Sequence, residues 1–177
     1  SGIGTAAIRM IRAAGAHVIV TAGSDEKCRR CLQLGADRAV NYREEDFAAA
    51  VKEASDGRGV DVVLDSIGAP YLERNLASLA VGGRLVEIGL MGGAKAELNL
   101  GSVLAKRLSI HGSTLRARPV AEKAAIVAGF DAAFGAALRA GRLDPTVDRV
   151  LPLAQAGEAH RAMKASEHFG KIVLRVE

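Results

Sequence analysis

The sequence contains few aromatic residues and no long apolar run. Among 177 residues there are no tryptophans, two tyrosines and four phenylalanines. So few aromatic rings offer no stacking platform for nucleic acid, and the lysines and arginines behind the net charge of +4 are interspersed with acidic residues. No apolar stretch reaches the length that spans a bilayer. We therefore expect neither a nucleic-acid partner nor a membrane partner.

Cysteine is also scarce. Cys28 and Cys31 are too few for a disulfide framework, which favours a cytoplasmic location. Their C-x-x-C spacing raises the alternatives of a zinc site or a redox pair. A zinc site needs a second cluster of ligands, and a redox pair follows a thioredoxin-like strand. Neither context is present, so we expect two structural cysteines one helical turn apart, one of them facing inward, and no metal site.

A glycine pattern opens the chain. Residues 2–7 read G-x-G-x-x-A at the start of a helical pattern, the form by which a strand–turn–helix unit accepts the pyrophosphate of a dinucleotide. Gly2 would permit the sharp turn, Gly4 the close approach of phosphate, and Ala7 close packing of helix on sheet. The helix dipole would then face the anion. The preceding strand is missing from the sequence, so an ordinary glycine-rich turn remains the alternative.

Helical and strand-like patterns alternate after this motif. Apolar spacing predicts helices over residues 4–14, 24–34, 44–55, 71–79 and 120–140. Runs rich in β-branched residues predict strands over residues 17–21, 38–42, 60–65, 84–88 and 108–112, with strands 17–21 and 60–65 buried on both faces. A Gly82-Gly83 turn is expected before the fourth strand. The alternation predicts an α/β fold with a doubly wound parallel sheet and right-handed crossovers.

The rhythm changes near residue 143. A strand over residues 147–153, a helix over 155–164 and a strand over 171–176 follow. We expect residues 1–142 to form a nucleotide-binding domain and residues 143–177 to belong to a different packing unit.

The end of the strand at residues 17–21 bears on the choice of cofactor. An NAD site of this type has an acidic residue there, whereas this chain continues with Thr21-Ala22-Gly23-Ser24. A small polar loop at a helix N-terminus favours a 2′-phosphate, to which Ser24 can donate its hydroxyl hydrogen and towards which Lys27 can reach. NADP is therefore favoured over NAD. The alternative is a capped, solvated start of a helix.

The motifs together resemble a known family. They are Ser1-Gly2-Ile3-Gly4-Thr5-Ala6-Ala7, Thr21-Ala22-Gly23-Ser24 with Lys27, Leu34-Gly35-Ala36-Asp37, Asn41-Tyr42, Asp65-Ser66-Ile67-Gly68, Gly89-Leu90-Met91-Gly92-Gly93 and Gly170-Lys171-Ile172-Val173-Leu174. Over its whole length the sequence resembles the medium-chain dehydrogenase/reductase superfamily. Within it, the sequence is similar to the zinc-independent quinone oxidoreductases related to zeta-crystallin and looks nearest to the tumour-suppressor-inducible subgroup.

The resemblance implies a Rossmann-like domain that binds NADP(H). Ser24 and Lys27 would hold the 2′-phosphate and Tyr42 would lie along the adenosine, although a half-buried strand-end tyrosine explains Tyr42 equally well. The implied cofactor-binding residues are Gly2, Ile3, Gly4, Thr5, Ser24, Lys27, Tyr42, Ile67, Gly68, Gly89, Leu90, Thr114, Leu115, Arg116, Phe169 and Lys171.

The family also has parts that this sequence does not show. An amino-terminal barrel-like catalytic domain and the first strand of the nucleotide domain are absent, and the segment over residues 143–177 would rejoin that domain. We expect a truncated chain that is inactive alone, and we assign no catalytic residue.

The implied function is NADPH-dependent reduction of quinones or other α,β-unsaturated carbonyls by hydride transfer. The alternatives are an enoyl-thioester reductase and a non-catalytic NADP-binding protein with a structural or sensing role. By the same resemblance, we expect a homodimer that pairs through the edge strand over residues 108–112.

Overall fold

Capping side chains and glycines set the helix ends in the computed structural model, which describes residues 1–176. Helix α2 (Asp25–Gln33) begins after Ser24, whose hydroxyl oxygen accepts a hydrogen bond from the backbone N–H of Lys27. Helix α1 (Gly2–Ala13) is followed by Gly15 at a φ of +73°, a left-handed conformation that ends a helix at little cost. The boundaries predicted for these two helices are therefore close to the observed ones.

The chain divides into two units, which we describe one at a time. The first combines residues 1–39 with the chain from Ile126 onward, and the second contains residues 40–125. The domain boundary expected between residues 142 and 143 stays a prediction.

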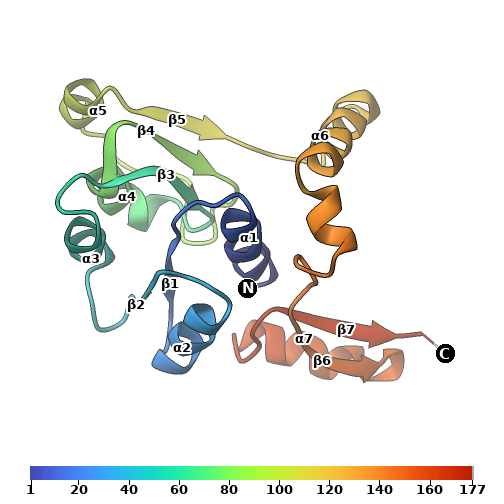
Figure 1. Ribbon diagram of the computed structural model, residues 1–177. Helices are drawn as coiled ribbons and strands as arrows, with labels where there is room; N and C mark the ends of the chain where they lie inside the picture. Colours follow the sequence, from blue (N-terminus) through green and yellow to red (C-terminus); the bar gives the residue numbers. More distant parts are fainter. Residues whose placement is uncertain (177) are drawn as a thin grey trace. The chain divides into compact units, whose positions relative to one another are not determined.

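The first unit contains helices α1 and α2 (Figure 1), which both contribute to one apolar core. Its other elements are β1 (Ile19–Ala22), β6 (Val147–Pro152), a 3₁₀ turn (Leu153–Gln155), α7 (Ala156–Lys164) and β7 (Lys171–Arg175). Strands β6 and β7 pair in parallel, with Val150 opposite Val173, and α7 packs against them. The core joins Ile8 of α1, Cys31 of α2 and Phe169, which stands just before β7. The amino-terminal helices and the carboxyl-terminal segment therefore share one core.

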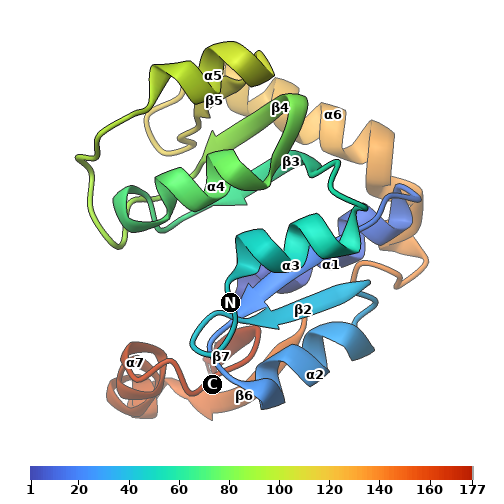
Figure 2. The same ribbon diagram turned by 90° about the vertical axis from the view of Figure 1, so that its left-hand side faces the viewer.

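The second unit is built around a parallel sheet in the order β3-β4-β5. Its elements are α3 (Phe47–Ala54), β3 (Val60–Asp65), a 3₁₀ turn (Ala69–Tyr71), α4 (Leu72–Ser78), β4 (Leu79–Glu87), α5 (Leu100–Lys106) and β5 (Ser109–Gly112). Helix α4 covers one face of the sheet (Figure 2), where Leu76, Leu79, Leu85 and Leu108 form the core.

Two elements cross between the units. They are β2 (Arg38–Asn41), which forms a two-stranded sheet with β1, and α6 (Val120–Arg139). The predicted α/β class with parallel strands is confirmed, and hydrogen bonding distributes the strands over three sheets. Within residues 1–176, no helix is both long enough and apolar enough to cross a bilayer.

Three local predictions are wrong. Gly82 and Gly83 form no turn before a strand, because they lie inside β4 at a register shift, with Gly82 at a φ of +78°. Strand β3 is not buried on both faces: Val63 packs against the core, while Val62 (43% exposed) and Leu64 (49% exposed) face away. Neighbouring strand residues alternate between faces, and α4 covers only one of them.

The prediction of one inward cysteine is the third that fails. Cys28 and Cys31 are both buried, and neither forms a disulfide. Residues three apart lie on the same side of a helix, so the side of α2 that places Cys31 in the core also covers Cys28. Burial is the main cause that raises the pKa of the Cys31 thiol. Both observations agree with structural cysteines.

Candidate functional site

The first turn of α1 presents an open backbone around Gly4. The Ser1 hydroxyl accepts a hydrogen bond from the Gly4 N–H at 3.0 Å. Apart from the backbone of the helix itself, it is the one group among residues 1–176 that a Cβ on Gly4 would meet, at 3.4 Å. The buried Thr5 hydroxyl donates instead to the Ser1 carbonyl at 3.2 Å. Gly4 therefore leaves room for a ligand to approach the backbone of this turn, while the Thr5 side chain is bonded to the helix backbone.

Gly2 has a different role from the one predicted. It is the first residue of α1 and has no positive φ, so it does not supply a sharp turn before the helix. A Cβ at this position would instead collide with the aliphatic carbons of Lys171, which lies directly against Gly2. The absence of a side chain at residue 2 thus lets a lysine from β7 reach the amino terminus of α1.

Cationic side chains gather at this positive end of the helix dipole. Lys27 Nζ donates a hydrogen bond to the Ser166 carbonyl oxygen. The Lys171 side chain lies against Gly2, the first residue of the helix. Cations at a helix N-terminus oppose its dipole and are stabilised when an anion joins them. The arrangement therefore favours binding of an anionic group.

The loop between β1 and α2 leads into a helix whose first turn carries Glu26, and the Glu26 carboxylate is paired with a cation. Ser24 caps α2 through its side-chain oxygen, as predicted, and Glu26 in the first turn forms an ion pair with Arg29. Lys27 follows in the same turn. Its ammonium group has three donor hydrogens, so the bond to Ser166 leaves two for another acceptor.

Phe169 is held in place before Lys171 by a charged network. The Arg30 guanidinium lies 4.2 Å from the centre of the Phe169 ring, and Asp148 accepts a hydrogen bond from the Phe169 N–H at 2.9 Å. Burial opposes ionisation of Asp148, but the bonds from Phe169 and Arg149 outweigh it and lower the pKa of this carboxyl. Phe169 is itself buried. This residue therefore fixes the path of the chain into β7.

In the second unit, two loops follow β3 and β4 and are bonded to each other. The Gly92 N–H donates to the Ile67 carbonyl at 2.8 Å, and the Ala69 N–H to the Gly93 carbonyl at 3.0 Å. Gly68 has a φ of +83°, and a Cβ there would lie 2.6 Å from the Gly93 oxygen. The predicted residues Ile67, Gly68, Gly89 and Leu90 are thus brought together at the carboxyl ends of adjacent parallel strands.

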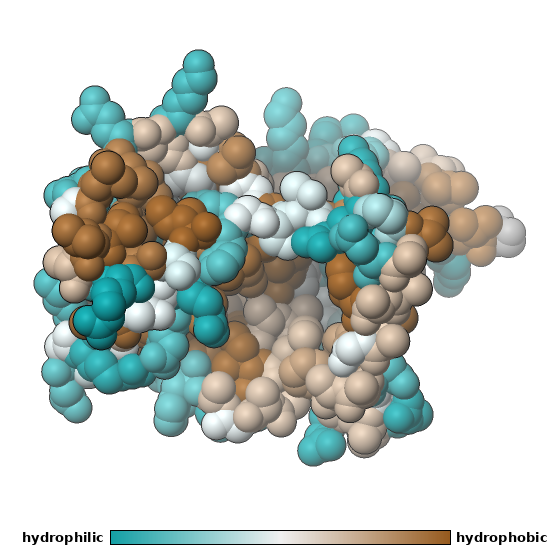
Figure 3. Space-filling view, turned by 90° about the horizontal axis from the view of Figure 1, so that it is seen from above, coloured by the Kyte–Doolittle hydropathy of each residue, from teal (hydrophilic) through white to brown (hydrophobic). Residues whose placement is uncertain are grey.

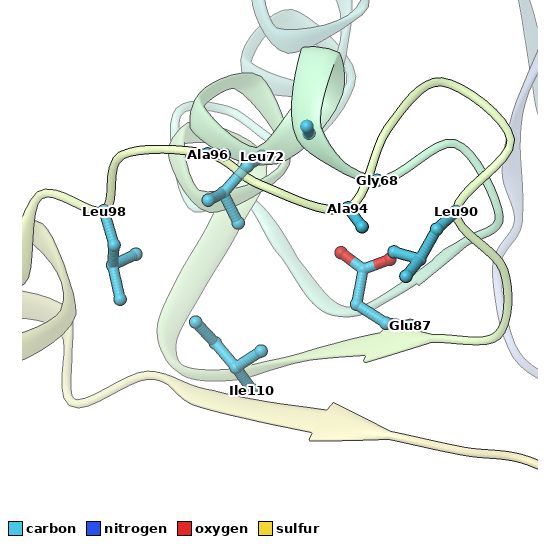
Figure 4. A pocket seen from close by; sticks show the side chains of 9 residues that line it. Gly68, Leu72, Glu87, Leu90, Ala94, Ala96, Leu98 and Ile110 are labelled. Atoms are coloured by element: carbon cyan, nitrogen blue, oxygen red, sulfur yellow. The ribbon is translucent and has the colours of Figure 1, made fainter.

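A cavity of about 270 Å³ lies beside these loops (Figure 4). Its walls are mostly apolar, and Gly68, Leu72, Leu90 and Ile110 contribute to them together with Ala69, Ala94, Ala96 and Leu98. Glu87 is the one ionisable residue among the lining residues, and in Figure 4 its carboxyl group points towards Ala94 with the Leu90 side chain beside it. Burial is the main cause that raises its pKa, followed by the charge of Asp65.

Tyr42 stands just after β2 and is 40% exposed. Its ring meets that of Tyr71 edge-on at 6.4 Å, and Tyr71 also packs against Phe47 and under the Arg74 guanidinium. Burial raises the pKa of Tyr71. Tyr42 therefore presents a ring braced from behind, which suits either of the roles considered for it from the sequence.

The segment after β5 carries the predicted residues Thr114, Leu115 and Arg116. The Ser113 N–H donates to the Glu87 carbonyl at 2.9 Å, two residues before Gly89. Arg118 donates to the Thr114 carbonyl at 2.6 Å, and Lys123 to the Arg116 carbonyl at 2.9 Å. This segment thus begins beside the loop that follows β4.

Sequence reasoning gave no role to Ser166, Asp65 or Glu87. Asp65 stands in a recognised motif, directly before Ser66 and Ile67, and its position at a strand end was the available signal. Glu87 stood inside an apolar run, where an acidic residue is itself unusual. No pattern in the sequence indicated that Ser166 would lie against Lys27.

A model of the zinc-binding dehydrogenase family matches residues 2–129. The chain is 33% identical over 178 residues to the 2-haloacrylate reductase of a Burkholderia species, a match that covers 98% of this chain and 52% of that protein. It is 31% identical over 174 residues to human quinone oxidoreductase, covering 98% and 51%. It is also 32% identical to a mycocerosic acid synthase-like polyketide synthase of Mycobacterium tuberculosis, covering 99% and 8%.

Solved structures give the same picture. Escherichia coli quinone oxidoreductase complexed with NADPH superimposes with a TM-score of 0.83 at 29% identity, over 99% of this chain and 54% of that one. An NAD-dependent alcohol dehydrogenase gives 0.82 at 38% identity, over 100% and 49%. The chain thus spans about half the length of the 2-haloacrylate reductase and quinone oxidoreductases that it matches.

The metal in the family's name can be compared with the residues present. Across residues 1–176, no group of three or more histidine, cysteine, aspartate or glutamate side chains is arranged to hold a metal ion. These residues therefore do not fit a zinc ion. Since the family model covers most of the chain, and its relatives are oxidoreductases, the chain belongs to the zinc-binding dehydrogenase family of the medium-chain dehydrogenase/reductase superfamily.

Proposed function

We propose that this chain supplies the NADP(H)-binding residues of a reductase that transfers hydride to a quinone or another α,β-unsaturated carbonyl. The observation that carries the proposal is the amino terminus of α1, where Lys171 from β7 lies against Gly2 beside the open backbone at Gly4. A dinucleotide with a 2′-phosphate brings more negative charge than any other common hydride carrier.

The residues fit the phosphates of the cofactor in two respects. The open backbone at Gly4 permits the close approach that a pyrophosphate needs. Ser24 and Lys27 would hold the 2′-phosphate, because no carboxylate precedes Asp25 in the loop after β1 and Glu26 is paired with Arg29. Phe169 and Lys171 would belong to the segment that returns to the cofactor from the carboxyl-terminal part of the chain.

The second unit would contribute the remaining cofactor contacts. Ile67 and Gly68, Gly89 and Leu90 stand at the carboxyl ends of β3 and β4, where open α/β sheets bind their ligands. Tyr42 would contact the adenosine, and Thr114, Leu115 and Arg116 would contact the nicotinamide end.

When bound, the cofactor supplies the hydride from its nicotinamide ring, while the protein binds and orients it. The substrate class is drawn from the relatives. One is a 2-haloacrylate reductase and another a quinone oxidoreductase, and both names describe reduction of a compound with a conjugated double bond. A second candidate function is that of an enoyl-thioester reductase, and the similarity to a polyketide synthase is the observation that supports it.

We also propose that the protein forms a homodimer through β5. This strand lies at the edge of its sheet, and Ile110 is exposed on it. The neighbouring helix α5 exposes Leu100 (70%) and Leu104 (81%), and a hydrophobic area is visible on the side of the molecule that carries these elements (Figure 3). An unpaired edge strand beside apolar side chains is suited to pairing with a second copy.

Turnover by the intact protein tests the proposed function. NADPH oxidation should be measured with a quinone, a small enone, a 2-haloacrylate and an enoyl thioester. Faster turnover of the quinone, enone or haloacrylate than of the thioester supports the proposal. Preference for the thioester supports the second candidate.

Tight NADPH binding without turnover of any of these acceptors would contradict the reductase assignment and favour a non-catalytic NADP-binding protein.

A cytoplasmic location is proposed from the scarcity of cysteine and from the likeness to quinone oxidoreductases.

A further inference from the structure

Two carboxylic acids stand side by side at the carboxyl edge of the sheet in the second unit. Asp65 ends β3, Glu87 ends β4, and the two residues are register partners in the parallel ladder. Paired residues on adjacent parallel strands project from the same face of a sheet. The next partner along the ladder, on β5, is Gly112, which brings no side chain. The two carboxyl groups therefore neighbour each other in a row that contains no cation.

Asp65 binds the loop that follows its own strand. Its Oδ1 accepts a hydrogen bond from the Ile67 N–H at 2.9 Å, and its Oδ2 accepts one from the Gly68 N–H at 2.8 Å. The residue is buried, at 5% exposure. Both oxygens act as acceptors, as in an ionised carboxylate.

Glu87 faces this carboxylate from β4. Its Oε2 is buried and has no hydrogen-bond partner within the described chain. Burial and then the charge of Asp65 raise the pKa of Glu87. Two ionised carboxylates in contact repel each other, and one shared proton removes the repulsion.

The causes that act on the pKa of Glu87 include burial and Asp65 but no cation, and the Arg74 guanidinium lies over the Tyr71 ring. Tyr71, in the 3₁₀ turn before α4, has its pKa raised mainly by burial, and the Asp65 charge contributes to that rise. Leu72 and Ile110 are apolar, and the charged residues Lys95 and Glu97 of the loop before α5 are exposed. Asp65 is therefore the charge that decides the state of Glu87.

The loops on either side depend on this pair. Ile88 N–H donates to the Asp65 carbonyl at 2.8 Å and Met91 N–H to the Ser66 carbonyl at 3.1 Å. These bonds join the loop of Ile67 and Gly68 to the loop of Gly89 and Leu90. A displacement of the Asp65 side chain would release its bonds to the first loop, and the second loop would lose its support.

We propose that Glu87 is a positioning residue that holds a proton against Asp65 and thereby fixes both loops in the geometry that binds the cofactor. The effect on the cofactor rests on the proposed function, whereas the shared proton does not. Deprotonation of Glu87 places a second negative charge beside Asp65 and loosens the two loops.

The direction of the pH dependence follows from the raised pKa. The stabilisation that the neutral acid gives is fully present below the ordinary glutamic acid pKa of about 4.3, and it is lost as pH rises through the higher value in the folded protein. NADPH binding by the wild type should therefore weaken with rising pH relative to a variant in which residue 87 cannot ionise.

Glu87→Gln supplies that variant, because the amide is neutral and its N–H can donate to Asp65. We expect the Kd for NADPH of the wild type, divided by that of Glu87→Gln, to rise several-fold as pH increases and Glu87 loses its proton. Taking the ratio cancels ionisation of the cofactor's own phosphate. Glu87→Ala should bind NADPH weakly at every pH, so that glutamine, but not alanine, preserves binding. A ratio that does not change with pH would overturn the proposal.

The proton itself can be observed in the intact wild type without cofactor. Infrared spectroscopy with carboxyl-labelled glutamate should show the carbonyl stretch of a protonated acid at pH values above those at which glutamate ordinarily titrates. The spectrum of Glu87→Gln should lack this band. Titration of every glutamate in the ordinary range would overturn the proposal even if the variants failed to fold. If the band is present but NADPH binds at no pH, the proposed function fails and the shared proton stands.

Discussion

Replacing Gly4 by alanine should stabilise the protein and weaken its binding of NADPH. The residue lies in the first turn of α1, and a Cβ there would meet only the Ser1 hydroxyl, at an ordinary contact distance of 3.4 Å. The fold can therefore accept the methyl group. Alanine is favoured over glycine in a helix by about 0.5–1 kcal/mol, so the free energy of unfolding should rise by up to that amount. The melting temperature should rise by about 1–4 °C.

The effect on the cofactor has the opposite sign. The methyl group would occupy the space through which a pyrophosphate approaches the backbone, and a hydrogen bond to a charged group contributes about 1.5–3 kcal/mol. Loss of one such bond would raise the Kd for NADPH by about ten- to a hundredfold. Fluorescence titration of the intact protein measures this change, and thermal unfolding without cofactor measures the stability.

Gly129→Ala is the matched control. Gly129 lies inside α6, and a Cβ there would meet nothing within 4 Å. It should give a similar gain in stability with no change in the Kd for NADPH. If Gly4→Ala bound NADPH as tightly as the wild type does, the assignment of the α1 amino terminus to the pyrophosphate would be refuted.

Three further predictions concern the loops, the surface and the carboxyl-terminal segment. Gly68→Ala should lower the free energy of unfolding by more than about 2 kcal/mol, because residue 68 has a left-handed φ and its new Cβ would clash with backbone. Gly82 has a similar φ but lies in open space, so Gly82→Ala should lower the free energy of unfolding by only about 1–2 kcal/mol. Denaturant titrations measure both changes. Leu104→Glu should convert a dimer to a monomer in sedimentation with little change in melting temperature, and an unchanged dimer would contradict pairing at β5. Asp148→Asn should lower stability by about 1–3 kcal/mol near neutral pH. Because the Asp148 pKa is lowered by folding, the wild-type advantage should shrink as pH falls below about 4, and a constant difference in urea titrations would argue against an ionised Asp148.

Local patterns predicted most helices and strands. Ser24, Gly15 and Gly35 marked helix ends that the structure confirms, because capping and left-handed φ values depend on residues close in sequence. Helix α5 was missed, although Asn99 caps it by accepting a hydrogen bond from the Ser102 N–H. It spans only residues 100–106, too few for a clear helical period.

The parts that could not be predicted depend on contacts between distant residues. The glycine pattern pointed to the α1 amino terminus, but no local signal showed that Lys171 would lie against Gly2 or that Lys27 would bond to Ser166. Asp65 and Glu87 stand 22 positions apart and become neighbours only through the register of β3 and β4. The family resemblance named the residues of the candidate site, and the structure supplied their contacts.

The most direct test of the NADP(H) assignment is the affinity of the intact protein for NADPH and NADH, measured by fluorescence titration in the wild type, Lys27→Glu and Lys164→Glu. Lys164 is an exposed lysine of α7 in the same unit, so its variant carries the same change of charge. We expect the wild type to bind NADPH more tightly than NADH, and Lys27→Glu to remove that preference by raising the Kd for NADPH about tenfold or more, with little effect on NADH. Lys164→Glu should keep the preference. Equal affinity of the wild type for the two cofactors, or an equal loss of both in Lys27→Glu, would contradict the account.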